Sequence, residues 1–372
     1  MVGCGLNRVA WEQATLPISK GGLGIRDPEQ GWAEARLAAT IGFHGRASAF
    51  VGLPEEFALT PLPDTPQVLS VMSTTLGPNH DPVSRWLASP PTLVNADLSY
   101  AKQSWWAGQV AEARKARLPT FGTARDHVRL LNQDGPFASA WLSASPNRAL
   151  RTVFPDVDFR SLCRFWLGLP LLPDGLPLPS CPECREAIDP FGDHFVACRK
   201  NGFTRRHNAL RDAWSQVLTA SNIRHDKEVS VPSGDRPADI LLIGWDKGMD
   251  VCVDLTVTSP TALDCYPLNP EKARRHLNEA EKAKKAKQFD ACDAMGWGHH
   301  PAAYSPWGGQ GTAARSLLHE VLKRATADQN GWAKTQRILE LRQNISVTLA
   351  REVARQLALR CRVVDTMEVV QD

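Results

Sequence analysis

Two short apolar runs, each with an aspartate, constrain the fold of this chain strongly. The runs Ile240 to Gly244 and Val251 to Val257 are rich in Ile, Leu and Val, and a four-residue turn, 245–248, separates them. Such runs predict buried strands. Asp239 opens the first run and Asp254 lies inside the second. A buried carboxylate is costly unless it is paired or binds a metal. Two of them on adjacent strands therefore predict a pocket for a divalent cation.

The length and composition are those of a globular protein. The 372 residues allow two domains or three, and the 43% apolar content is ordinary. The net charge of only +3 means that any basic surface for nucleic acid must be local. No apolar run of about 18 residues occurs, so we expect no membrane span and an intracellular protein. The nine cysteines are scattered, which argues against a disulfide framework.

One group of cysteines has the spacing of a metal site. Cys181, Cys184, His194 and Cys198 form the pattern C-x2-C-x9-H-x3-C. Three thiolates and one imidazole suit tetrahedral Zn²⁺, and a closed site of this type is structural, not catalytic. The alternatives are reduced, buried cysteines beside a chance histidine, or His207 as a substitute ligand.

The segment after this cluster predicts an amphipathic helix over 204–221. Its N-terminal end carries Arg205, Arg206, His207 and Arg211. Basic residues at that end oppose the helix dipole, so they are not explained by helix stability. A phosphate partner would explain them, and a solvated, charged helix start is the alternative.

The elements around the two runs follow a definite order. After the helix at 204–221, the sequence predicts strands at 227–231, 239–244 and 250–257, a basic helix at 271–294, a strand at 300–305, and helices at 313–327 and 332–362.

The N-terminal half predicts mostly helices and loops. A turn, Gly21-Gly22-x-Gly24, precedes a helix at 31–41. It lacks the Lys-Ser/Thr of a phosphate-binding loop, so a tight turn is the better interpretation. Residues 51–100 predict a loop or linker with short helices, and weak helical patterns follow before a helix at 153–169.

The chemistry that fits the two aspartates is phosphodiester hydrolysis. Mg²⁺ or Mn²⁺ held by carboxylates can activate water and neutralise charge on phosphate oxygens. Asp239 and Asp254 are the expected ligands and Glu228 is a weaker third candidate. A lysine near the metal would stabilise the transition state, and the predicted helix at 271–294 supplies Lys282, Lys284, Lys285 and Lys287. Of these, Lys282 and Lys285 lie three apart and share one helix face, so they are the expected pair. The alternative is that these acids and lysines are ordinary surface residues.

Several motifs together resemble the C-terminal region of non-LTR retrotransposon reverse transcriptase proteins. RPADI and the Asp254 of DLTVTSP resemble the core of their restriction-like endonuclease, of the PD-(D/E)-x-K type. The Cys181-Cys184-His194-Cys198 pattern is similar to the zinc knuckle upstream of it. Arg206-His207-Asn208 resembles its R-H-N element, and Lys282, Lys285 and Phe289 its K-x2-K-x3-Y pattern. WEQATLPISKGGLGIR resembles a segment downstream of the polymerase palm.

The resemblance implies a mixed α+β or α/β fold with a mostly helical N-terminal half and an αβββαβ nuclease core followed by C-terminal helices. It implies the end of a thumb-like segment at 1–50, a linker and helical region at 51–175, a zinc knuckle at 176–202 and an endonuclease domain at 203–362. Three positions depart from the family pattern. Ala238 lies between Pro and Asp, Phe289 replaces the tyrosine, and no lysine lies two residues after Asp254.

The expected function is a metal-dependent DNA endonuclease that nicks target DNA. The resemblance implies structural zinc and catalytic Mg²⁺ or Mn²⁺. It implies DNA as a partner, with element RNA or a polymerase portion as further partners, and a nuclear location. The residues expected to contact nucleic acid are Arg205, Arg206, His207 and Arg236. No Y/F-x-D-D motif is present, so no polymerase activity is expected. The alternative is a catalytically inactive, zinc-containing nucleic-acid-binding fragment.

Overall fold

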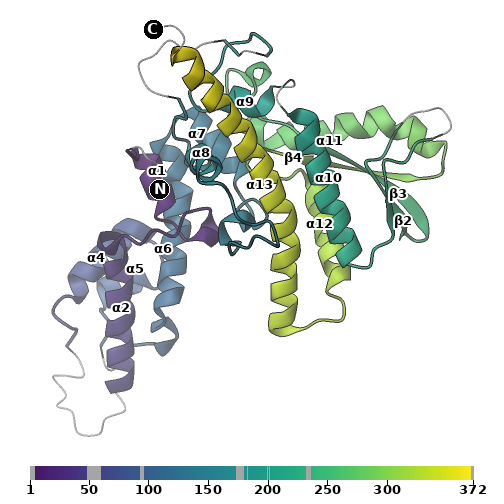
Figure 1. Ribbon diagram of the computed structural model, residues 1–372. Coiled ribbons are helices and arrows are strands. Elements are labelled where there is room, and N and C mark those ends of the chain that lie inside the picture. Colours follow the sequence, from purple (N-terminus) through teal and green to yellow (C-terminus); the bar gives the residue numbers. More distant parts are fainter. Residues whose placement is uncertain are drawn as a thin grey trace. The chain divides into compact units, whose positions relative to one another are not determined.

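The computed structural model (Figure 1) describes residues 5–47, 60–92, 96–172, 180–181, 183–198, 200, 202–231 and 236–369. The chain forms two compact units, one of Trp11–Phe121 and one of Met1–Ala10 with Gly122–Asp372. The described part is mixed α+β: it is mostly helical and has a four-stranded sheet. This confirms the coarse fold class expected from the sequence. Among the described helices, none has both the length and the apolar character needed to cross a membrane.

The smaller unit is a group of helices packed around tryptophan side chains. Its helices are α2 (Pro28–Ala47), α4 (Thr65–Leu76), α5 (Val83–Ala88) and α6 (Gln103–Arg117). It also contains the 3-10 helices η1 (Ile18–Lys20), η2 (Leu98–Tyr100) and η3 (Leu118–Phe121). The boundary between the two units falls within α1 (Arg8–Ala14). Leu37, Met72, Trp86 and Trp106 are buried in one core. The indole N–H of Trp106 donates to the carbonyl oxygen of Tyr100 at 2.8 Å, so its polar atom is satisfied. The expected loop or linker region at 51–100 therefore contains packed helices, while its stretches 51–59 and 93–95 lie outside the described residues.

The glycine turn before α2 is a tight turn, as predicted. Gly21 and Gly24 have φ of 85° and 68°, in the left-handed region that glycine adopts readily. A Cβ at Gly22 would lie 2.0 Å from the carbonyl oxygen of Leu16, so only glycine fits there. Backbone geometry explains these glycines without a phosphate ligand.

The larger unit contains the sheet, in the order β1-β2-β3-β4. Its strands are β1 (His225–Lys227), β2 (Ile240–Asp246), β3 (Met249–Val257) and β4 (Gly298–Tyr304). The pairs β1–β2 and β2–β3 are antiparallel, whereas β3–β4 is parallel. A parallel pair needs a crossover, and α11 (Pro270–Asp293) supplies it. The first strand is earlier than predicted: Glu228 has φ of 52°, which ends the extended conformation after Lys227.

Helices pack on this sheet from several parts of the chain (Figure 1). α10 (Phe203–Ala220) contacts β1 and β3, α11 contacts β3 and β4, and α12 (Thr312–Ala325) contacts β4. The long α13 (Gly331–Val369) packs against α10 and against α8 (Asp156–Leu167). The remaining elements of this unit are α7 (Ala124–Asn132), η4 (Ala140–Ser143), α9 (Asp193–Ala197) and η5 (Leu263–Cys265). From α10 to β4 the predicted order of helix, three strands, helix and strand is present.

Candidate active site and metal centre

The antiparallel pairing of β2 and β3 brings Asp239 and Asp254 together. Ile240 pairs with Val253 across β2 and β3, and just beyond this pair the carboxyl groups of Asp239 and Asp254 interact with each other. The backbone N–H of Asp239 donates to the Val253 carbonyl at 3.0 Å, and the N–H of Leu255 donates to Asp239 Oδ2 at 2.6 Å. We call these two carboxylates the aspartate pair.

Burial makes the two carboxylates unequal. Asp254 is only 5% exposed, and this burial together with the neighbouring Asp239 raises the pKa of its carboxyl group more than Lys284 lowers it. For Asp239, burial would raise the pKa, but its hydrogen bond to His207, the N–H of Leu255 and the charge of Lys284 lower it overall. Asp254 Oδ2 is buried with no hydrogen-bond partner among the described residues. An unsatisfied carboxylate oxygen is costly, and a bound cation would compensate it.

Two basic side chains from neighbouring helices contact the aspartate pair. Lys284 of α11 places Nζ 2.9 Å from Asp254 Oδ1, and His207 of α10 places Nε2 2.9 Å from Asp239 Oδ1. His207 therefore contacts Asp239 rather than the cysteines, which removes the alternative in which it is a substitute zinc ligand. The site has one carboxylate held by an imidazole and a backbone N–H, and a second held by an ammonium group.

The lysines expected at this site lie elsewhere. Lys282 and Lys285 are exposed and line a separate hollow of about 560 Å³ with His299 and His300. Phe289, in the tyrosine position of the family pattern, is also exposed. The structure thus brings Lys284 to the aspartate pair in place of the two expected lysines.

Glu228 and Arg236 both precede Asp239 in the chain, and the described residues show no contact between their side chains and the two carboxylates. Glu228 forms an ion pair with Arg211 of α10, and its backbone N–H donates to the Asp239 carbonyl at 3.0 Å. Its carboxylate is therefore directed to an arginine. Arg236 is exposed, three residues before Asp239.

The two arginines at the start of α10 have different environments. Arg206 is 2% exposed and donates to the Val196 carbonyl and to Gln356 Oε1, each at 2.9 Å. Arg206 therefore ties α9, which contains Val196, to α13, and its guanidinium group is occupied by partners within the protein. The side chain of Arg205 is 61% exposed and its Nε lies 3.0 Å from Glu352 Oε2. Arg205 stays available at the surface.

Cys181, Cys184, His194 and Cys198 form a cluster that could hold a metal ion such as zinc. Their ligand atoms all lie within 4.8 Å of one another. The Sγ atoms of Cys181 and Cys198 are 4.0 Å apart, and Cys184 Sγ is 3.2 Å from His194 Nε2. Ligands at about 2.3 Å in a tetrahedron would be separated by about 3.8 Å. The donor atoms and their spacing fit the ion.

Local hydrogen bonds shape this cluster. Burial would raise the pKa of Cys181, but the backbone N–H groups of Cys184 and Glu183 and the His194 side chain lower it to about 6. A thiol with a low pKa is a ready metal ligand because the thiolate is the form that binds. On the other side, Asp189 Oδ2 accepts from the N–H of His194 at 2.7 Å, which fixes the start of α9.

A buried ion pair fixes α9 from α7. Arg125 Nη2 donates to Asp193 Oδ1 at 2.8 Å, and both side chains are buried. His194 is the next residue. The ligand helix is thereby attached to the body of the larger unit.

Comparison of the sequence with protein-family models and with curated proteins gives no match. The geometry of the site therefore carries the functional argument.

Proposed function

We propose that this protein is a metal-dependent endonuclease that nicks DNA by phosphodiester hydrolysis. The observation that carries the proposal is the aspartate pair, with the buried and unpartnered Oδ2 of Asp254 beside the ammonium group of Lys284. A divalent cation between the two carboxylates would satisfy this oxygen, and oxygen ligands of this kind suit Mg²⁺ or Mn²⁺.

The residues of the chain have separate roles in this proposal. When bound, the divalent ion would activate water and neutralise charge on the phosphate. Asp239 and Asp254 hold it. His207 and the N–H of Leu255 fix the orientation of Asp239. Lys284 presents a positive charge that stabilises the charge developing on the phosphate oxygens.

The order of elements supports the same function. The succession α10, β1, β2, β3, α11 and β4 is the one expected for a PD-(D/E)-x-K nuclease core. The Cys181-Cys184-His194-Cys198 cluster, with zinc as its metal, would be the zinc knuckle of the non-LTR retrotransposon proteins that the sequence resembles. Arg205 and Arg236, both exposed, are the proposed DNA contacts. A nuclear location belongs to the same proposal.

A plasmid-nicking assay with Mg²⁺ or Mn²⁺ tests the function. We expect wild type to convert supercoiled plasmid to the open circle, and Asp239→Ala and Asp254→Asn to lose this activity by at least about a hundredfold. The matched control is Asp246→Asn, which removes an exposed carboxylate from the other end of β2, about 23 Å from Asp239. Equal nicking by wild type and Asp239→Ala would rule out catalysis by the pair.

A second candidate is a zinc-stabilised nucleic-acid-binding protein without catalysis. The observation that favours it is that both oxygens of Asp239 and one of Asp254 already have partners within the chain. A closed network of this kind can be structural. It predicts salt-dependent DNA or RNA binding and no cleavage with any divalent metal.

A further inference from the structure

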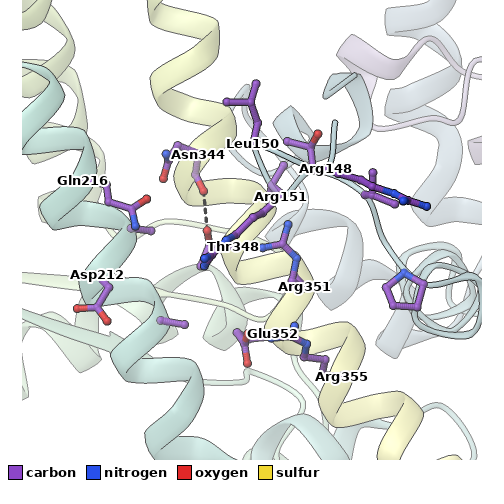
Figure 2. Close-up of a pocket in the computed structure, with 16 residues that line it drawn as sticks. Arg148, Leu150, Arg151, Asp212, Gln216, Asn344, Thr348, Arg351, Glu352 and Arg355 are labelled. Carbon is purple, nitrogen blue, oxygen red and sulfur yellow. Dashed lines mark hydrogen bonds and ion pairs between the residues drawn. The ribbon is translucent and has the colours of Figure 1, made fainter. Parts of the chain in front are cut away.

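A pocket rich in arginine lies between α10 and α13, away from the aspartate pair. Its volume is about 620 Å³, and the segment 148–155 closes one side. Figure 2 shows Asp212 and Gln216 on α10 facing Asn344, Thr348 and Arg351 on α13. Four arginines line this arginine pocket: Arg148, Arg151, Arg351 and Arg355.

The acidic residues of the arginine pocket do not neutralise it. Asp212 is bound by Lys227 at 3.1 Å and by Arg211 at 3.2 Å. Glu352 is bound by Arg205 at 3.0 Å, from outside the lining, and by Arg355. Glu352 thus pairs with one of the lining arginines, and because four arginines line the pocket with only two carboxylates, positive charge remains on the lining.

Arg351 is the side chain with the strongest need for a partner. Its Nη2 is buried and has no hydrogen-bond partner in the part of the chain that the structure describes. Burial and the like charges of Arg355 and Arg151 lower the pKa of its guanidinium group, and the nearby carboxylate of Glu352 offsets this only in part. Clustered guanidinium groups that lack an acceptor are unfavourable. An anion in the pocket would relieve both the repulsion and the missing hydrogen bond.

The dimensions and the rim indicate which anion fits. The cavity is much larger than a lone phosphate needs and lies in the usual range for organic ligands, about 300–1,000 Å³. Leu150 is 72% exposed and Val153 is 42% exposed beside the arginines. Arginine forks match phosphate oxygens in geometry, and apolar side chains can pack on an unstacked base. The lining therefore fits a phosphate together with its nucleoside.

We propose that the arginine pocket binds a phosphate of an unpaired nucleic-acid strand. α10 contributes His207 to the aspartate pair and Asp212 and Gln216 to the pocket, so a strand held there is bound by the same helix that contacts the candidate active site. Paired bases are stacked and hidden, which is why the rim suits an unpaired strand. The substrate class rests on the proposed nuclease function, but binding at the pocket requires neither the catalytic metal nor cleavage.

Fluorescence anisotropy with labelled single-stranded DNA, without added divalent cation, tests this pocket. The variants are Arg148→Gln/Arg151→Gln, which changes exposed side chains only, and Arg351→Gln. We expect each of these two variants to weaken binding by at least about tenfold. The slope of the logarithm of the binding constant against the logarithm of the salt concentration should fall by about 0.7 for each lost phosphate contact. The control Lys334→Gln removes a charge from the same helix, about 25 Å away, and should change affinity by less than about twofold.

Circular dichroism and thermal unfolding verify that each variant is folded. If both pocket variants bind within about twofold of wild type, or if Lys334→Gln loses as much as they do, the proposal is overturned. It is also overturned if duplex DNA binds through these arginines as tightly as the single strand, or if inorganic phosphate alone stabilises wild type while oligonucleotides do not bind. If wild-type protein binds the single strand through these arginines but nicks no DNA, the nuclease proposal is wrong and the proposal for the arginine pocket is still supported.

Discussion

Replacing Glu281 with alanine should destabilise the larger unit by about 3–5 kcal/mol. Glu281 lies on α11 and is only 5% exposed. Its Oε2 accepts from the N–H of Ala313 at 2.9 Å, and its Oε1 accepts from Ala314 at 2.9 Å and from Ala303 of β4 at 3.3 Å. The first N–H groups of a helix have no acceptor within the helix, so this carboxylate caps α12.

The magnitude follows from these contacts. A hydrogen bond to a charged group contributes about 1.5–3 kcal/mol, and a negative charge at a helix N-terminus about 0.3–2 kcal/mol. Because three bonds to one side chain are not additive, about 3–5 kcal/mol is expected in place of their sum. The same contacts hold α11 against β4, and Lys284 lies one turn further along α11.

Urea unfolding followed by circular dichroism measures this loss. The control is Glu279→Ala, which removes an exposed carboxylate two residues earlier on the same helix and should cost less than about 0.5 kcal/mol. Separate transitions for the two units are expected, and only that of the larger unit should move, with an unchanged m-value. If Glu281→Ala loses no more stability than Glu279→Ala, the capping argument is wrong.

Three further predictions concern the lysines, the cysteines and pH. Lys284→Ala should reduce nicking by about a hundredfold, whereas Lys282→Ala and Lys285→Ala should stay within about threefold of wild type; equal losses in all three would contradict the assignment of Lys284. Elemental analysis should find about one zinc per chain, absent from a Cys181→Ser/Cys184→Ser variant, and retention of zinc by that variant would exclude the cluster. Burial opposes ionisation of Asp126, but Arg129 and Thr123 lower the pKa of its carboxyl group overall. The ionised form therefore stabilises the fold above about pH 4, and this contribution is lost as pH falls through the lowered pKa. The difference in urea midpoint between wild type and Asp126→Asn should therefore shrink from pH 7 to pH 3, and a constant difference would refute this role of the ionised Asp126.

The parts of the site that are local in sequence could be predicted. The four side chains of the cluster that could hold a metal ion are positioned by spacing within a short loop and a short helix. Asp239 and Asp254 were recognisable because one opens an apolar run and the other lies inside one, and the antiparallel pairing of β2 and β3 brings their carboxyl groups together.

The choice of lysine depended on how α11 is rotated against the sheet. Its inward face is marked by Ala273, Leu277 and Glu281, at intervals of four residues, and Lys284 continues that face three residues later. A buried glutamate breaks the apolar pattern, so the face was not visible in the sequence. Lys282 and Lys285 lie on the exposed side.

The burial of Arg206 was likewise hidden from the sequence. A charged residue at a helix start is ordinarily solvated. Here Gln356, distant in the chain, and the carbonyl of Val196 accept its hydrogen bonds. Such partners exist only after tertiary packing.

Binding of Mn²⁺, measured by electron paramagnetic resonance, tests the metal-holding role of the aspartate pair most directly. The account predicts a Mn²⁺ site in the wild-type zinc-loaded protein, weakened at least about tenfold by Asp254→Asn and unchanged by Asp246→Asn. Binding to Asp254→Asn with wild-type affinity would contradict the central claim.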